Sequence, residues 1–345
     1  MIWASPISGA KPMRAIAYRH SLPITDPAAL EDVDLPDPVA QGRDLLVRIE
    51  AIAVNPVDTK VRRNVDPGGA VKVLGYDAAG VVVATGPEVS LFKVGDRVFY
   101  AGALDRPGTN SQLHLVDERI VGPMPASLDF AAAAAMPLTF ITAWELLFDR
   151  LGVTAEDKRS LLIIGGAGGV GSAAIQLARH LTGLTVVATA SRPQSRQWCL
   201  DLGAHHVIDH GQDLVAQWRA LSLGGADVIL ALTNTDQHQA ALAEIIAPQG
   251  ALGLIDDPKG FDIGLFKRKA ISIHWEFMFT RSLFQTDDMI AQHTLLKRVA
   301  ELVDQGVLRS TQAQSLGPID AATLRRAHAL IEDGHAMGKV VLAGF

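Results

Sequence analysis

Apolar and polar residues along the middle of the chain follow two periods, one typical of buried strands and one typical of amphipathic helices. Short apolar runs bounded by turns predict six strands, at 161–164, 185–190, 206–209, 227–231, 248–255 (after an opening turn) and 270–275. Helical periodicity fills the gaps near 170–181, 193–202, 212–222 and 236–247. This alternation predicts an α/β fold with a doubly wound parallel sheet of six strands, over about 130–275.

The segments on either side have a different pattern. Before residue 130, short strand-like runs at 45–50, 80–84 and 97–100 are separated by turns rich in proline and glycine, which predicts an antiparallel β-rich domain. The tail carries helical stretches near 287–305 and 321–333 and a strand at 339–342. We expect it to return, so that residues 1–129 and 276–345 form one domain with 130–275 inserted. Residues 1–12 precede the first strand-like run and are expected to be a loose extension.

A glycine-rich turn joins the first strand of the central sheet to its first helix. In the run Leu161–Gly171, Gly166, Gly168 and Gly171 fit the pattern G-x-G-x-x-G, with Gly169 and Val170 inside it. Glycines at this spacing let the backbone approach a pyrophosphate, and the helix N-terminus supplies unpaired N–H groups and partial positive charge. Since a strand precedes the turn and a helix follows it, the pattern predicts a dinucleotide site rather than a merely flexible loop.

The residues after the second strand indicate which dinucleotide is bound. NAD sites usually place an acidic residue about 20 positions after the glycines, where it binds the ribose 2′-hydroxyl. Here the segment holds Ser191, Arg192 and Arg196 and no carboxylate. Because a guanidinium group can donate two hydrogen bonds to a phosphate, we expect NADP(H), bound through its 2′-phosphate. The alternative is that both arginines simply face solvent at a helix start.

Composition narrows the class of protein further. The chain has 345 residues, 48% of them hydrophobic and 20% charged, which is enough for two domains with sizeable cores. Its net charge of −6 and scattered basic residues argue against a nucleic-acid surface. The single cysteine, Cys199, excludes a disulfide framework and suits the reducing cytoplasm. We expect no signal peptide and no membrane span, because the most apolar run, 130–144, is short and interrupted by Pro137.

Several motifs together resemble the medium-chain dehydrogenase/reductase superfamily, over nearly the whole chain from Met13. They are Ala51–Asp58 (AIAVNPVD), Leu74–Gly80 (LGYDAAG), Val94–Val98 (VGDRV), Met136–Ala143 (MPLTFITA), Gly165–Gly171 and Gly338–Val341 (GKVV). The first two are similar to the quinone oxidoreductase branch, and 255–258 and 274–279 are similar to a bacterial subgroup often named zinc-type alcohol dehydrogenase-like. The resemblance implies a GroES-like catalytic domain around an inserted Rossmann domain.

The same motifs imply that this chain works without catalytic zinc. Zinc-dependent members of the superfamily hold the metal with a cysteine, a histidine and a second cysteine or an acid. The matching positions hold Asn55, Tyr76 and Leu138, which are not good zinc ligands. The four-cysteine loop of a structural zinc site is missing as well. We therefore expect no bound metal.

Asn55 and Tyr76 are the predicted catalytic residues. Both can donate hydrogen bonds to a carbonyl oxygen, which suits reduction of a quinone or an α,β-unsaturated carbonyl by NADPH. The resemblance implies that Asn55 lies beside the nicotinamide ribose or the substrate carbonyl, and that Thr142 contacts the nicotinamide. The alternatives are a turn residue for Asn55 and a core residue for Tyr76.

Other residues are less strongly indicated as members of the same site. We expect Asp58 and Asp77 to anchor loops rather than to transfer protons. Further candidates for lining the cleft are Tyr100, Asn110, Phe277, Met278 and Phe279, although residues of the last three kinds after a strand more often belong to the core.

Two other functions stay open from the sequence. One is alcohol or aldehyde interconversion, and the other is a low-turnover NADPH-binding sensor or structural protein, which would keep every cofactor residue. The sixth strand, 270–275, would lie at an edge of the sheet. Because sheet edges are either covered or paired, we expect a homodimer joined through this strand.

Overall fold

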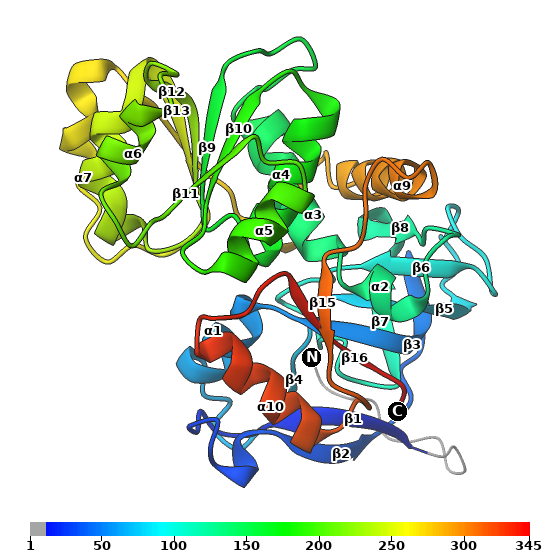
Figure 1. Ribbon diagram of the computed structural model, residues 1–345. Helices are drawn as coiled ribbons and strands as arrows, with labels where there is room; N and C mark the ends of the chain where they lie inside the picture. Colours follow the sequence, from blue (N-terminus) through cyan, green and yellow to red (C-terminus); the bar gives the residue numbers. More distant parts are fainter. Residues whose placement is uncertain (1–11) are drawn as a thin grey trace. The chain divides into compact units, whose positions relative to one another are not determined.

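A computed structural model describes residues 12–345 (Figure 1). Within them the chain forms two compact units, one made of residues 12–138 and Phe279–Phe345 and the other of Thr139–Met278. The predicted limits of the inserted domain, 130 and 275, stay a prediction. The expected loose extension at 1–12 lies, apart from Pro12, outside the described residues.

The second unit is built on the six-stranded parallel sheet that the alternating pattern predicted. Its strand order is β11-β10-β9-β12-β13-β14. Leu162 of β9 pairs with Val187 on one side and with Ile229 on the other, so the order reverses at β9, where dinucleotides bind in such sheets. The strands are β9 (Ser160–Ile164), β10 (Thr185–Thr189), β11 (His206–Ile208), β12 (Ala226–Ala231), β13 (Ile246–Leu254) and β14 (Ser272–Trp275).

Helices lie on both sides of this sheet, α4 and α5 on one side and α6 and α7 on the other (Figure 1). Local sequence sets where they start: Pro193 opens α5, and the Asp213 side chain accepts a hydrogen bond from the Ala216 amide at the start of α6. Trp218 of α6 and Leu242 of α7 pack with the strands in one buried core. The helices are α4 (Gly169–Leu181), α5 (Pro193–Asp201), α6 (Leu214–Ala220), α7 (Thr235–Ile245) and a 3-10 helix at Ile263–Lys269.

The first unit is the predicted β-rich domain. Its larger sheet has the order β15-β16-β3-β5-β6-β8, with β7 also paired to β3, and its smaller sheet has the order β2-β1-β4. The tail returns as expected, because β16 runs antiparallel to β3 with Val340 opposite Val54. The strands are β1 (Met13–Tyr18), β2 (Glu31–Leu35), β3 (Asp44–Val54), β4 (Lys72–Val73), β5 (Ala78–Thr85), β6 (Arg97–Tyr100), β7 (Leu113–Asp117), β8 (Val121–Pro123), β15 (Gln312–Ser315) and β16 (Lys339–Ala343).

Helices complete this unit and link it to the other. They are α1 (Pro56–Asn64), α2 (Phe130–Ala134), α3 (Pro137–Trp144), α8 (Thr280–Leu283), α9 (Ala291–Asp304) and α10 (Ala321–Glu332), with short 3-10 turns at Pro27–Ala29 and Glu118–Ile120. The division between the units falls inside α3, after Leu138. The predicted fold class, a Rossmann-type parallel sheet inserted in a GroES-like β-rich domain, is confirmed.

The apolar run at 130–144 forms two buried helices, α2 and α3, with the second beginning at Pro137, and a π-helical turn, Glu145–Arg150, extends α3. The whole run, Phe130–Arg150, is long and apolar enough to cross a membrane by length and composition, but 78% of its most apolar stretch is buried in the protein, as in a core helix. The fifth strand begins at Ile246, and the predicted turn is an irregularity within it, where Gln249 adopts a φ of 64°.

Candidate active site

The turn between β9 and α4 contains glycine where any side chain would collide. A Cβ atom on Gly171 would lie 2.3 Å from the Gly165 carbonyl oxygen, and one on Gly166 would lie 2.7 Å from the Ala188 Cβ. A Cβ on Gly168 would meet nothing closer than 3.5 Å. The packing of β9, β10 and α4 therefore requires Gly166 and Gly171, whereas Gly168 borders open space.

That open space lies at the first amides of α4. Gly168 precedes the helix, and its carbonyl accepts the hydrogen bond of the Ser172 amide at 2.8 Å. The amides of Gly169, Val170 and Gly171 come before this bond, so they can donate to an oxyanion, and the helix dipole adds partial positive charge. These residues fit the pyrophosphate of a dinucleotide.

The two arginines after β10 have different surroundings. The Arg196 guanidinium is partly buried and donates to the carbonyl oxygens of Val207, at 2.8 Å, and of Ala190, at 3.4 Å. It therefore ties the ends of β10 and β11 together. The Arg192 side chain is exposed at the start of α5, next to the exposed Ser191. Of the predicted 2′-phosphate ligands, Ser191 and Arg192 are the ones placed to meet a ligand from solvent.

The predicted catalytic residues lie in the first unit, in a buried polar group that we call the Asn55 cluster: Asn55, Asp58, Tyr76, Asp77 and Lys339. Asn55 directly precedes α1 and is 1% exposed. Its Nδ2 donates to Asp77 Oδ2 at 2.8 Å and to the Tyr76 carbonyl oxygen at 3.3 Å, and its Oδ1 accepts from Lys339. Both amide hydrogens are used inside the cluster, so Asn55 has no donor left here for a substrate carbonyl.

Asp77 lies between the three positions that correspond to zinc ligands in zinc-dependent relatives, Asn55, Tyr76 and Leu138. Its Oδ2 accepts from Asn55 and, at 2.8 Å, from Lys339 Nζ, while its Oδ1 accepts from the Leu138 backbone amide at 2.8 Å. Tyr76 is its neighbour in the chain. Burial raises the pKa of Asp77, and the Lys339 ammonium opposes that shift. Three donors around one carboxyl group favour its ionised form, and Asp77 anchors the loop as expected.

The pKa values of Asp58 and Tyr76 are also raised. Asp58 Oδ2 accepts from the Asn55 backbone amide at 2.8 Å, and burial raises the pKa of Asp58 to about 7. The Tyr76 ring lies edge-on to Phe279, with 5.4 Å between ring centroids. Burial first, and then the Asp58 charge, raise the pKa of Tyr76 above its usual value of 10.0. The Tyr76 hydroxyl therefore keeps a proton that it can donate at neutral pH.

The remaining candidates are distributed over both units. Thr142 is buried in the second unit, in α3. Phe277 is 48% exposed, whereas Met278 is buried. The buried Tyr100 hydroxyl is hydrogen-bonded to His114 Nδ1 at 3.0 Å, so it is engaged within the first unit. Asn110 is also buried there, with its backbone paired to Ile16.

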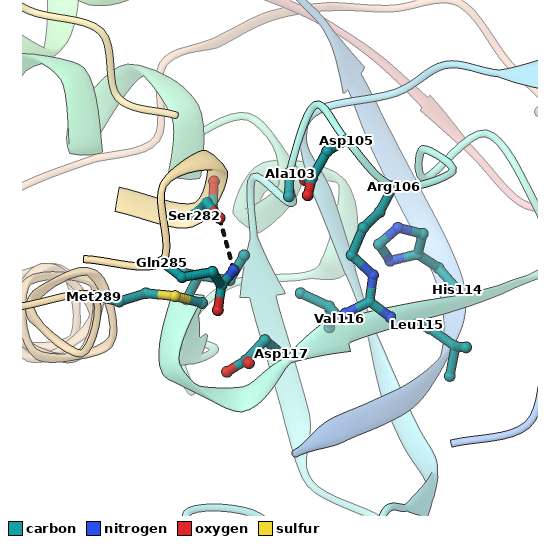
Figure 2. Close-up of a pocket in the computed structure, with 11 residues that line it drawn as sticks. Ala103, Asp105, Arg106, His114, Leu115, Val116, Asp117, Ser282, Gln285 and Met289 are labelled. Atoms are coloured by element: carbon teal, nitrogen blue, oxygen red, sulfur yellow. Dashed lines mark hydrogen bonds between the residues drawn. The ribbon is translucent and has the colours of Figure 1, made fainter. Parts of the chain in front are cut away.

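A cavity of about 130 Å³ opens in the first unit between β7 and the segment 282–289 (Figure 2). Two of its charged lining groups have partners in the fold: Arg106 donates to Asp44 at 2.8 Å, and Asp117 accepts from Arg119 at 2.8 Å. A third, Asp105, is exposed. Gln285 donates to the Ser282 carbonyl oxygen, as Figure 2 shows. None of the residues of the Asn55 cluster lines this cavity.

Sequence reasoning missed Lys339. It opens β16 and is 3% exposed, and its ammonium donates to Val54, Asn55 and Asp77. Two signals in the sequence include this lysine, the GKVV motif at 338–341 and its place at the start of an apolar strand, KVVLA, but neither indicated a role in the site. A lysine there more often marks the end of a strand at the surface, so the pattern did not single it out.

Two family models match the chain. One, the alcohol dehydrogenase GroES-like domain, matches residues 41–126, and the other, a zinc-binding dehydrogenase, matches residues 202–342. A zinc-type alcohol dehydrogenase-like protein of Staphylococcus epidermidis is 37% identical over 335 residues, which is 96% of this chain and 99% of that protein. A quinone oxidoreductase of Mus musculus is 33% identical over 235 residues, 65% of this chain and 67% of that protein.

Solved structures are similar to the chain over nearly its whole length as well. A Rhizobium etli protein described as a zinc-dependent alcohol dehydrogenase is 56% identical, with a TM-score of 0.94 over 97% of this chain and 99% of that one. A mycobacterial protein complexed with NADPH is 26% identical, with a TM-score of 0.82 over 96% and 99%. An NAD-dependent alcohol dehydrogenase is 28% identical, with a TM-score of 0.81 over 96% and 100%. These similar proteins thus include one complexed with NADPH and one described as NAD-dependent.

Proposed function

Because the chain belongs to the medium-chain dehydrogenase/reductase superfamily and is therefore an oxidoreductase that uses a nicotinamide cofactor, we propose that it transfers hydride from NADPH to a quinone or an α,β-unsaturated carbonyl, without catalytic zinc. The observation that carries this proposal is the Asn55 cluster. Where zinc-dependent relatives need metal ligands, it offers a carboxamide at Asn55 and a protonated hydroxyl at Tyr76, with the buried Lys339 ammonium paired to Asp77 in the same cluster.

The donor set does not fit a zinc ion. The positions of the three ligands hold a carboxamide, a phenol and a leucine. The carboxylate between them, Asp77, already accepts from three donors, one of which is an ammonium group. Over residues 12–345, no group of three or more histidine, cysteine or acidic side chains is arranged to hold a metal. Catalytic zinc needs about three such ligands, so no step of the proposed reaction uses a metal.

NADPH is favoured over NADH by the surroundings of the predicted ribose site. Ser191 and Arg192 are exposed at the end of β10, where an NAD site would place an acid. The amides of Gly169, Val170 and Gly171 would hold the pyrophosphate. The bound cofactor supplies the hydride, and the protein positions it and stabilises charge on the acceptor oxygen.

The cluster suits reduction of an electron-poor carbon better than oxidation of an alcohol. After hydride addition to an enone or a quinone, negative charge develops on oxygen, and the neutral Tyr76 hydroxyl can donate a hydrogen bond to it. Oxidation of an alcohol needs a base that removes a proton, and Tyr76, with its raised pKa, is a poor one. The second candidate, alcohol or aldehyde interconversion, is favoured only by the names of the relatives. A cytoplasmic location is part of the proposal, since a chain with a single cysteine carries no disulfide framework of the kind typical of secreted proteins.

The first prediction concerns the reaction. Purified protein should oxidise NADPH with a quinone or an enone, and should oxidise primary alcohols slowly or not at all. A chelator should leave this activity unchanged, and elemental analysis should find no stoichiometric zinc. Faster turnover of alcohols than of any quinone or enone would contradict the proposal. Turnover of none of these substrates would favour a binding protein.

The second prediction concerns the cofactor. Arg192→Ala should weaken NADPH roughly tenfold to a hundredfold and leave NADH nearly unchanged, since a hydrogen bond to a charged group contributes about 1.5–3 kcal/mol. Arg219→Ala is the matched control, because Arg219 is also an exposed arginine of the second unit and pairs only with Glu244. Equal affinity of the unmodified protein for both cofactors would contradict the role of Arg192. Calorimetric titration of the unmodified protein and both variants with NADPH and NADH measures these affinities.

A further inference from the structure

His328 is a fully buried histidine with no hydrogen-bond partner in the described part of the chain. It lies in the second half of α10 and is 0% exposed, and neither of its ring nitrogens is bonded to another group of residues 12–345. Buried polar groups are nearly always paired, because an unpaired one is unfavourable. An apolar side chain of similar size would pack there without that cost, so packing alone does not account for the imidazole.

The nearest charge to His328 belongs to a buried cation. The helices α1 and α10 lie side by side (Figure 1), and Arg62 of α1 is also 0% exposed. Its guanidinium donates to the Leu22 carbonyl oxygen and to Glu332 Oε1, at the end of α10. Burial first, and then the Arg62 charge, lower the pKa of His328 from 6.5 to about 3. His328 is therefore uncharged in the folded protein at neutral and mildly acidic pH.

The other ionisable groups around α10 do not balance a charge on His328. Glu332, one helical turn after His328, is already paired with Arg62. The Tyr18 hydroxyl of β1 donates to the Val65 carbonyl oxygen at 2.8 Å, and burial raises the pKa of Tyr18 to about 12, so it stays neutral. The remaining charged side chains of α1, α10 and the strands packed on α10 are bonded to other groups or reach solvent: Asp44, Arg48, Glu50, Asp58, Lys60, Arg63, Arg325, Arg326 and Lys339.

The two halves of α10 are held in different ways. The first half is anchored by Arg325, whose guanidinium donates to two backbone carbonyl oxygens of the segment 27–30. The second half is held to α1 by the pair of Glu332 with Arg62 and by packing around His328. A charge on His328 therefore acts on the second half of the helix.

We propose that His328 is a pH switch for the second half of α10: its uncharged ring allows this half to pack against α1, and its protonation in acid releases it. Protonation would place an imidazolium beside the buried Arg62 guanidinium, and buried charges are unfavourable unless they are balanced. Residues 333–338 connect this half to Lys339 of β16, so release also disturbs the Asn55 cluster. That last consequence for the active site rests on the proposed function, whereas the switch itself does not.

The size of the effect follows from proton linkage. The released state exposes His328, whose ordinary pKa is 6.5, whereas burial lowers its pKa to about 3 in the packed state. Between these two values the released state binds more protons, so each fall of one pH unit favours release about tenfold. From pH 7 to pH 5 the population of the released state should therefore increase about 25-fold.

Hydrogen exchange followed by mass spectrometry at pH 7 and pH 5, corrected for the intrinsic effect of pH on exchange, tests the switch. In the unmodified protein, peptides that cover 328–338 should lose about 25-fold in protection, and peptides that cover 321–327 should lose less. His328→Leu cannot be protonated at this position and should keep its protection over 328–338 at both pH values. His20→Leu is the control, because the His20 side chain is 55% exposed in the same unit, and it should behave like the unmodified protein.

Two results would overturn the proposal: an equal loss of protection in both halves of α10, which indicates general acid unfolding, and the same loss in His328→Leu as in the unmodified protein. If His328→Leu does not fold, an NMR titration of the imidazole rings in the unmodified protein replaces it. A His328 ring that is protonated at pH 5 while 328–338 stays protected would overturn the proposal, and a ring that stays neutral while protection falls would support it. These measurements use neither cofactor nor substrate, so a protein that reduces neither quinones nor enones would contradict the proposed function alone.

Discussion

At the scale of single residues, hydrogen-bond partners rather than identity or burial decide what the acids of the Asn55 cluster do, because Asp58 and Asp77 are both buried. Asp77 is surrounded by three donors and favours its ionised form, whereas Asp58 is bonded to one backbone amide and titrates near neutrality. The motifs identified Asn55 and Tyr76 because each occupies a position that the resemblance associates with a zinc ligand. Lys339 also lies in a motif, but its role could not be predicted, because its contacts join residues 284 and 262 positions apart.

The third prediction follows from Asp58. Burial raises its pKa from 3.8 to about 7, so between these values the folded protein keeps a proton that the unfolded chain has lost. Stability should therefore fall as pH rises from about 4 to 7 and level off above that, with a loss on the order of 4 kcal/mol. Asp58→Asn removes this term, because the amide stays neutral while its oxygen can still accept from the Asn55 amide.

Urea unfolding at pH 4.5, 6 and 8 measures this effect. The free energy of unfolding of Asp58→Asn, relative to the unmodified protein, should increase steadily across the series. Asp37→Asn, at an exposed aspartate, should show no such trend. Parallel curves for Asp58→Asn and the unmodified protein would show that Asp58 is ionised at no free-energy cost in the fold.

At the scale of elements, the sequence was most informative where the pattern is local. The strand β9, the glycine turn and α4 follow from eleven consecutive apolar and glycine positions, 161–171, and the helical period after them. The charged strand β2 and the helix α1 were missed. β2 is paired on one edge only, and three of its five residues, EDVDL, are acidic, so it lacks the apolar alternation of a strand. The π-helical turn was also missed, because nothing in its local periodicity distinguishes it from an α-helix.

The fourth prediction separates two kinds of glycine in the turn. Gly171→Ala should destabilise the second unit, because the new methyl group would lie 2.3 Å from a carbonyl oxygen of the turn. Gly168→Ala should fold with nearly unchanged stability, since its methyl group would be 3.5 Å from the nearest atom. It should nevertheless lose much of its dinucleotide affinity, because the methyl group would fill the space at the first amides of α4.

Thermal unfolding and NADPH titration of both variants check this. A Gly168→Ala variant that binds NADPH normally would place the pyrophosphate elsewhere. A Gly171→Ala variant with unchanged stability would show that β9 and α4 can move apart at no cost in the free energy of unfolding.

At the scale of the whole molecule, the chain is two units of which one is discontinuous. The return of the tail was predictable because a final apolar strand, 339–342, needs a partner sheet, and β3 provides it. The two sheets could be assigned to parallel and antiparallel classes from the helices between their strands. The buried charges that these sheets bring together could not be predicted, because they depend on the register between strands that are distant in the chain.

The fifth prediction is that the protein is a homodimer joined through β14. This strand is at one edge of the six-stranded sheet, and its last residue, Trp275, is 54% exposed. Two other large apolar side chains nearby in sequence, Ile263 and Phe277, are 65% and 48% exposed. An edge with unpaired backbone groups and exposed apolar side chains is suited to pairing with a second copy.

Light scattering should therefore give about twice the chain mass of 36.7 kDa. Trp275→Lys should reduce this to one chain mass at micromolar concentration, because a charge would enter an apolar contact. Phe284→Lys, at an apolar residue 70% exposed in the first unit, should stay dimeric. A monomeric unmodified protein, or equal dissociation of both variants, would show that β14 is not the interface.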